Sequence, residues 1–198
     1  MKKASNPYRE IKRKRREAIV EWASRSFAGG STFRMFAVGD SNEIRKFLCE
    51  EIGDCGKLVR VGTQEEYDKQ LFKLIGKLRT KIRLNRNSRG RKVNFGQAAK
   101  VINLYIKQFL LFPDFMSLRC PKDHLYRLAH VPLDRVILDH IWRDFGTQME
   151  AHKIKRKPAL RDLDQRIYTK LQSILAEAAR DEKMARLAYD FRWATRES

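Results

Sequence analysis

The strongest constraint on the fold is an apolar segment at residues 96–112. Its apolar residues recur at helical spacing and cover more than one side of a helix. One face would carry Val101, Leu104 and Tyr105, and another Ile102, Ile106, Phe109 and Leu110. A helix that is apolar nearly all round lies at the centre of a protein. Pro113 then ends the pattern. The sequence therefore predicts a buried central helix surrounded by other helices.

The rest of the chain contains several amphipathic segments. Their periodicity and their capping residues predict helices at residues 8–27, 41–52, 63–84 and 133–145, and one or two helices over residues 161–189. Residues 57–61 predict a short strand or turn, and residues 33–38 fit a strand or a helix equally well. No internal repeat and no clear domain boundary is visible. We therefore expect a mainly α fold with few or no strands, formed by a single domain over residues 1–198.

Positive charge dominates the polar residues. The chain contains 43 Lys and Arg against 24 Asp and Glu, which gives a formal net charge of +19. Such a charge opposes compaction unless a polyanion neutralises it, and DNA or RNA is the polyanion that fits best. An anionic membrane is the alternative, but no lipidation signal and no apolar run typical of a signal peptide is present. We expect a nucleic-acid partner and no membrane contact.

The cysteines and histidines indicate neither a disulfide framework nor a metal site. Cys49, Cys55 and Cys120 are odd in number and fit no paired metal-binding spacing. The histidines at positions 124, 130, 140 and 152 also lack short-spaced partners. We expect reduced thiols in a cytoplasmic protein, with no metal and no other cofactor.

Two basic stretches are candidates for contact with the phosphate backbone. Residues 79–92 contain no acid, and we expect Arg83, Arg86, Arg89, Arg91 and Lys92 to bind DNA phosphates. The alternative is a flexible surface linker, because the stretch is polar and contains glycine. Residues 12–16 are all basic and form either a solvated helix face or a second backbone contact.

Two residues have the chemistry expected of a catalytic pair. Lys100 falls in the first turns of the predicted central helix, and burial of a lysine favours its neutral, nucleophilic amine. Asp134 follows Pro132 in the first turn of its own helix, where backbone amides favour an anion. Taken singly, the lysine also fits a side chain that reaches solvent, and the aspartate fits an ordinary first-turn acid.

The surrounding motifs suggest a family. The segment Gly96-Gln97-Ala98-Ala99-Lys100-Val101-Ile102, followed by Val131-Pro132-Leu133-Asp134-Arg135-Val136, resembles the helix-hairpin-helix DNA glycosylase superfamily, nearest its archaeal 8-oxoguanine glycosylase-like branch. Lys100 and Asp134 are 34 residues apart. The sequence departs from the pattern at the hairpin, where Gly96 is followed by Ala98 instead of a second glycine, and it lacks the cysteines of an iron–sulfur cluster.

The resemblance implies a DNA glycosylase that flips a modified base out of the duplex and excises it, and defence against phage DNA is the role that we expect for such an enzyme. Asp134 would stabilise the developing sugar cation, and Lys100 would attack the anomeric carbon to form a Schiff base. The flipped base would stack on or bond to Asn103, His130, Phe95, Tyr105 and Trp142. Gly96 and Gln97 of the hairpin would bind the DNA backbone, together with the basic stretch before them.

Two other functions remain open. Arg119 and His124 satisfy the Arg-x4-His pattern of HEPN-type ribonuclease toxins, although Pro121 between them disfavours the helix that such a site needs. The other alternative is a basic, non-enzymatic protein that coats or bends DNA, with Lys100 and Asp134 as structural residues.

Overall fold

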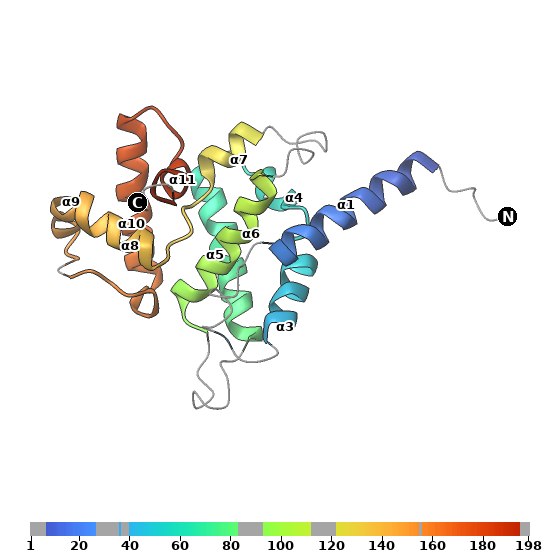
Figure 1. Ribbon diagram of the computed structural model, residues 1–198, viewed down its shortest axis with the longest axis horizontal. Helices are drawn as coiled ribbons and strands as arrows, with labels where there is room; N and C mark the ends of the chain where they lie inside the picture. Colours follow the sequence, from blue (N-terminus) through green and yellow to red (C-terminus); the bar gives the residue numbers. More distant parts are fainter. Residues whose placement is uncertain are drawn as a thin grey trace.

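The computed structural model describes residues 7–26, 36, 40–82, 93–111, 122–154 and 156–194, and this part of the chain is helical without a strand. The helix α6 (Phe95–Leu111) lies at the centre beside α5 (Gln64–Lys81) (Figure 1). One side of these two helices holds α1 (Pro7–Ser26), α3 (Asp40–Phe47) and α4 (Gly56–Val59). The other holds α8 (Arg135–Asp144), α9 (Gly146–Ala151), α10 (Gln165–Asp181) and α11 (Ala188–Ala194). The predicted mainly α fold is confirmed.

The central helix α6 is buried on most of its circumference, as its sequence predicts. It packs against α1, α5, α10, the short helix α7 (Lys122–Leu128) and the 3-10 turn Leu160–Asp162. Burial of each large apolar side chain contributes about 1.5–3 kcal/mol, so this helix is the main source of core stability. Its less buried positions include Lys100, Leu104 and Lys107, which form one stripe at three- and four-residue steps. The polar side chains of α6 that can react or bind therefore lie on this stripe.

Side chains cap the helices that the sequence predicts best. Thr63 accepts a hydrogen bond from the backbone N–H of Glu66 at the start of α5. Asp164 accepts one from the N–H of Ile167 at the start of α10. Before α6, Asn94 and Gln97 bond reciprocally, each side chain accepting from the other's backbone N–H. These caps satisfy amides that the helices leave unpaired, and they explain where the helices begin.

Several elements differ from the predictions. Residues 48–52 form a π-helix that continues α3, and residues 57–61, predicted as a short strand or turn, lie largely in the one-turn helix α4. The one or two helices predicted over 161–189 are α10 and α11, preceded by the 3-10 turn, and the chain breaks between them near Lys183, whose φ is 54°. The helices α7 and α9 are not among the predicted elements, because they are too short to show a helical period. The segment 33–38 lies outside the described residues apart from Phe36.

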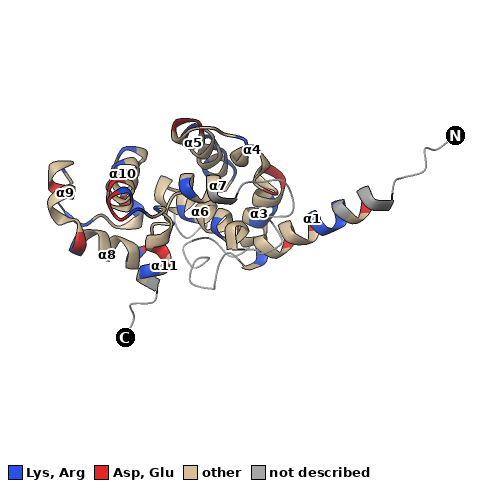
Figure 2. Cartoon of the chain, turned by 90° about the horizontal axis from the view of Figure 1, so that it is seen from above, with Lys and Arg blue, Asp and Glu red and all other residues tan. Residues whose placement is uncertain are grey.

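The helix α1 projects from the rest of the molecule (Figure 1). Its basic run is partly neutralised: Arg13 pairs with Glu17 at 2.7 Å, and Arg16 pairs with Asp54 at 2.7 Å. Figure 2 shows Lys and Arg on α1, α6 and α10, so positive charge is not confined to the projecting helix α1. None of the described helices is long and apolar enough to cross a membrane.

Candidate active site

The structure brings Lys100 and Asp134 together. Lys100 lies in the second turn of α6, and Asp134 is the N-cap of α8, where its Oδ1 accepts a hydrogen bond from the backbone N–H of Ile137 at 3.0 Å. Its other carboxylate oxygen, Oδ2, lies 3.8 Å from the Nζ of Lys100. The side chain of Lys100 is 14% exposed and that of Asp134 is 36% exposed. The amine and the carboxylate therefore form a partly sheltered pair that remains open to solvent on the aspartate side.

A second lysine–aspartate pair lies close to the first. Lys107, two helical turns after Lys100 on the stripe of α6, forms an ion pair with Asp190 of α11. The side chain of Lys107 is 18% exposed and that of Asp190 is 11% exposed, so the carboxylate of this pair is more enclosed than that of Asp134. The ammonium of Lys107 also lies 4.8 Å from the ring centroid of Phe191, a cation–π distance. We call these four residues, Lys100, Lys107, Asp134 and Asp190, the paired-lysine cluster.

Electrostatics couples the two pairs of the paired-lysine cluster. Burial is the largest cause that raises the pKa of Asp190, and the negative charge of Asp134 raises it further. The ammonium groups of Lys107 and Lys100 oppose this shift. Burial therefore favours the neutral form of Asp190, while the two ammonium groups favour its ionised form. The cluster thus combines an amine, an N-cap carboxylate and a partly desolvated second carboxyl group.

Lys107 and Asp190 are not among the residues predicted from the sequence. A signal for Lys107 was present, because a lysine seven residues after Lys100 falls on the same face of an apolar helix. No comparable signal marks Asp190, which reaches the cluster only through the packing of α11 against α8 and the core.

Three residues predicted to contact a flipped base lie together in the core. Phe95, Asn103 and His130 are at most 6% exposed, and all three contact Tyr168 of α10. Asn103 donates to the Tyr168 hydroxyl at 2.7 Å, and the Phe95 ring lies 5.3 Å from the Tyr168 ring. Because neighbours cover these side chains, the structure uses them for packing, and the predicted contacts with a base are not available to them in this arrangement.

The other two predicted base contacts are in different places. Tyr105 is fully buried on α6, packs against Phe109 and donates its hydroxyl hydrogen to the backbone carbonyl of Gly53 at 2.8 Å. Trp142 is partly buried and packs against the core from α8. The five residues therefore form no common pocket. The aromatic side chains among them, which recur at helical spacing, pack in or against the core.

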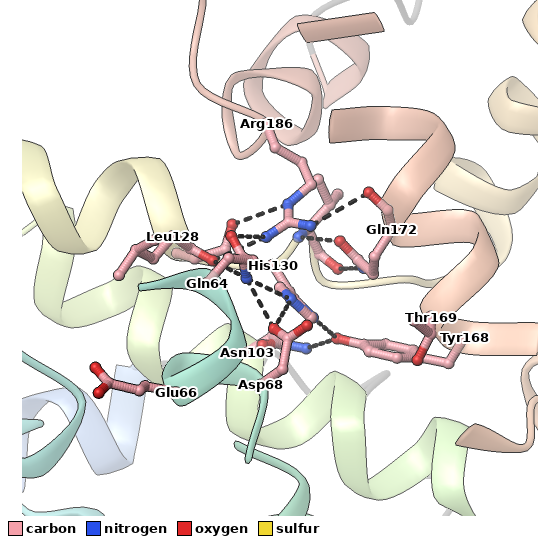
Figure 3. A network of polar contacts seen from close by, with 12 residues as sticks. Gln64, Glu66, Asp68, Asn103, Leu128, His130, Tyr168, Thr169, Gln172 and Arg186 are labelled. Carbon is pink, nitrogen blue, oxygen red and sulfur yellow. Dashed lines mark hydrogen bonds and ion pairs between the residues drawn. The ribbon is translucent and has the colours of Figure 1, made fainter. Parts of the chain in front are cut away.

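His130 belongs to a buried polar network that spans four parts of the chain (Figure 3). Its Nδ1 lies 2.9 Å from the Tyr168 hydroxyl, and its Nε2 lies 2.8 Å from Oδ1 of Asp68 on α5. Burial lowers the pKa of His130 to about 4, with a smaller lowering by the charge of Arg186, while Asp68 opposes the shift. The imidazole is therefore neutral at physiological pH, and it serves as a hydrogen-bonding group within the core.

Arg186 and Gln172 complete this network around the segment that leads to Asp134. The guanidinium of Arg186 donates to the carbonyls of Leu128 at 2.8 Å and Gln172 at 3.2 Å, and to the side-chain oxygen of Gln64 at 3.2 Å (Figure 3). The Gln172 amide bonds both the N–H and the carbonyl of Val131. The network thus fixes residues 128–131, only three residues before Asp134, and it positions one half of the paired-lysine cluster.

No family model matches this sequence, and comparison with curated proteins and with solved structures gives no match either.

The hairpin residues predicted to bind DNA have internal roles. The backbone N–H of Gly96 donates to the carbonyl of Leu163 at 3.1 Å, and a Cβ at this position would lie 2.2 Å from the carbonyl oxygen of Leu160. Gln97 is the partner of Asn94 in the cap of α6. The glycine is needed here for close packing against residues 160–163, so its amide is not free to bind a phosphate.

Two other predicted sites fall wholly or partly outside the described residues. Arg83, Arg86, Arg89, Arg91 and Lys92 all lie in the range 83–92, which the structure does not describe. Arg119 also lies outside the described residues. His124, its expected partner in the ribonuclease pattern, is described, and its Nε2 lies 2.7 Å from the carbonyl oxygen of Val61.

Proposed function

We propose that this chain is a DNA glycosylase that excises a modified base and leaves an abasic site. The observation that carries this proposal is the 3.8 Å approach of Lys100 to Asp134, two residues separated by 34 positions in the sequence. An N-cap carboxylate beside a sheltered amine suits a reaction in which a sugar cation develops and a nucleophile attacks it. The net charge of +19 supports a DNA partner.

The chemistry follows from the placement of each group. The target nucleotide must leave the stack before its glycosidic bond can be reached. The Asp134 carboxylate accepts a proton from the Lys100 ammonium, and the resulting amine attacks the anomeric carbon. The bond to the base breaks, and its electron pair leaves with the base, which takes a proton from the Lys107–Asp190 pair. The sugar remains attached to Lys100, and ring opening gives a Schiff base that permits strand cleavage.

A basic protein that binds DNA without catalysis is the second candidate. Both pairs of the paired-lysine cluster are partly buried, and such ion pairs also serve as links between helices. In that case the cluster would hold α6 against α8 and α11, and its carboxylates would have no chemical role. The two candidates predict different behaviour of the same variants.

The test incubates the full chain with unmodified DNA and with phage DNA that carries modified bases, then uses alkali to reveal abasic sites. We expect strand breaks with the wild type and a rate lower by about 100-fold or more with Asp134→Asn, because an amide cannot accept the proton that frees the Lys100 amine for attack. Asparagine caps a helix as well as aspartate does, so α8 should fold normally. Borohydride should trap a covalent complex with the wild type but not with Lys100→Gln.

Asp164→Asn is the matched control. Asp164 caps α10 as Asp134 caps α8, accepting a hydrogen bond from the N–H of Ile167 at 2.7 Å. This variant should retain the wild-type rate. Equal rates for all variants, or intact DNA with the wild type despite tight binding, would contradict base excision on these substrates and favour the non-catalytic protein.

A further inference from the structure

A groove with no acidic residue in its lining lies between the end of α9 and the first half of α10. Its volume is about 460 Å³, and it is lined by His152, Gln165, Arg166, Thr169, Lys170 and Ser173. These side chains offer cationic groups, hydroxyls and an amide, which are hydrogen-bond donors suited to an anion. We call it the α9–α10 groove.

Lys170 holds the two sides of the α9–α10 groove together. Its Nζ donates to the backbone carbonyl of His152 at 2.5 Å. An ammonium group has three donors, so this bond leaves others available for a ligand. The nearest N-cap carboxylate, Asp164, accepts the N–H of Ile167 and is not among the residues that line the groove. The groove therefore keeps its positive character although α10 begins with an acid.

The turn that follows α9 adds positive charge beside the groove. Lys153 is exposed and has a φ of 61°, a left-handed conformation that glycine adopts without cost. The backbone N–H of Lys153 donates to the carbonyl of Glu150, and the N–H of Ile154 donates to the carbonyl of Met149. This is the pattern of a helix end that favours glycine. The chain thus has a lysine where glycine would be more stable. Arg156 is also exposed, whereas Lys157 pairs with Asp139.

We propose that the α9–α10 groove binds the phosphate backbone of DNA, at a site distinct from the paired-lysine cluster. Arg166, Lys170 and Ser173 lie at i, i+4 and i+7 on α10 and so span about 10 Å along the helix. This length matches about three nucleotides of one DNA strand, which rise about 3.4 Å each. The large exposed apolar side chains of the described residues are Ile11, Trp22, Leu111 and Val136, none of which lines the groove, and this disfavours a membrane surface.

This inference rests on the DNA partner of the proposed function but not on catalysis. We would therefore measure binding to unmodified duplex DNA as a function of salt concentration, using the full chain. Each phosphate contact that is lost should reduce the slope of log K against log salt by about 0.9, which is about an 8-fold loss of affinity at 0.1 M salt. The double variant Arg166→Gln/Lys170→Gln should reduce the slope of log K against log salt by about twice this amount.

Lys153→Gly separates loss of binding from loss of folding. It removes one charge beside the groove and also relieves the left-handed backbone, so its melting temperature should equal or exceed that of the wild type while DNA binding weakens. Lys183→Gly is the matched control, because Lys183 has a φ of 54° at the end of α10 and is also exposed. It lies about 20 Å along the helix from Lys170. This control should melt at least as high as the wild type and bind DNA as the wild type does.

The outcomes distinguish a groove from a general effect of charge. Unchanged salt slopes for the groove variants would overturn the proposal, as would equal weakening by Lys153→Gly and Lys183→Gly. Loss of binding to phosphatidylserine-containing vesicles with unchanged DNA binding would assign the groove to a lipid headgroup instead. If the groove variants bind DNA weakly but the wild type excises no base, the groove stands and the glycosylase proposal fails.

Discussion

Replacement of Gly96 by alanine tests whether this residue packs the core or binds DNA. A Cβ at position 96 would lie 2.2 Å from the Leu160 carbonyl oxygen and 2.9 Å from the Leu163 Cβ. The first of these is a backbone atom that a rotamer change cannot move. Overpacking of this kind costs about 3 kcal/mol, while alanine gains about 1 kcal/mol over glycine in a helix. We therefore expect Gly96→Ala to lower the free energy of unfolding by about 2 kcal/mol.

Urea unfolding followed by circular dichroism measures this change. Gly76→Ala is the matched control, because Gly76 is exposed on α5 and has no atom within 4 Å of its would-be Cβ. It should stabilise the protein by about 1 kcal/mol. DNA affinity per folded molecule should be the same in both variants and the wild type. A Gly96→Ala protein that is as stable as the wild type but binds DNA weakly would refute the packing role and restore Gly96 as a phosphate contact.

Two further predictions concern the buried network. Because the pKa of His130 falls from 6.5 in the unfolded chain to about 4 in the folded one, the unfolded state binds the extra proton. The contribution of His130 to the free energy of unfolding should be complete above pH 6.5 and fall by about 3 kcal/mol as the pH falls to 4. Urea unfolding of His130→Gln should show a smaller loss of stability over this pH range. An identical loss in the variant and the wild type would contradict this assignment. Tyr168→Phe removes the hydroxyl that contacts Asn103 and His130 and should cost about 3 kcal/mol. Tyr189→Phe, which loses a bond to Glu182, should cost about 1 kcal/mol in the same assay, and equal losses would count against the network.

Local sequence determines the elements that were predicted correctly. The apolar periodicity of 96–112 is strong enough to define α6, and the cap at Thr63 fixes the start of α5, whereas Asp134, expected in the first turn of its helix, is the N-cap of α8. The sequence predicts Lys100 and Asp134 as a catalytic pair without a distance between them, and the structure places Nζ and Oδ2 3.8 Å apart. These features depend on interactions between residues close in sequence or on one dominant pattern.

The remainder of the candidate site depends on contacts between distant residues, which periodicity does not encode. Asp190 joins the paired-lysine cluster through the docking of α11, and Asn103 and His130 face Tyr168 instead of an open pocket. Gly96 looked like a hairpin glycine, yet its constraint comes from a carbonyl more than sixty residues later. A side chain at helical spacing shows that a helix has a buried face but not which partner covers it.

The bonds of Arg186 have a consequence for the order of events during synthesis. The guanidinium joins residues from α5, from the segment before α8 and from α10, and Asp190 follows four residues later. A nascent chain that has emerged from the ribosome only as far as α10 lacks both side chains. Its carbonyls at 128, 129 and 172 then have no guanidinium to bind, and Lys107 has no carboxylate partner. The paired-lysine cluster can therefore be completed only after residue 190 has left the ribosome, although Lys100, Lys107 and Asp134 are synthesised well before it.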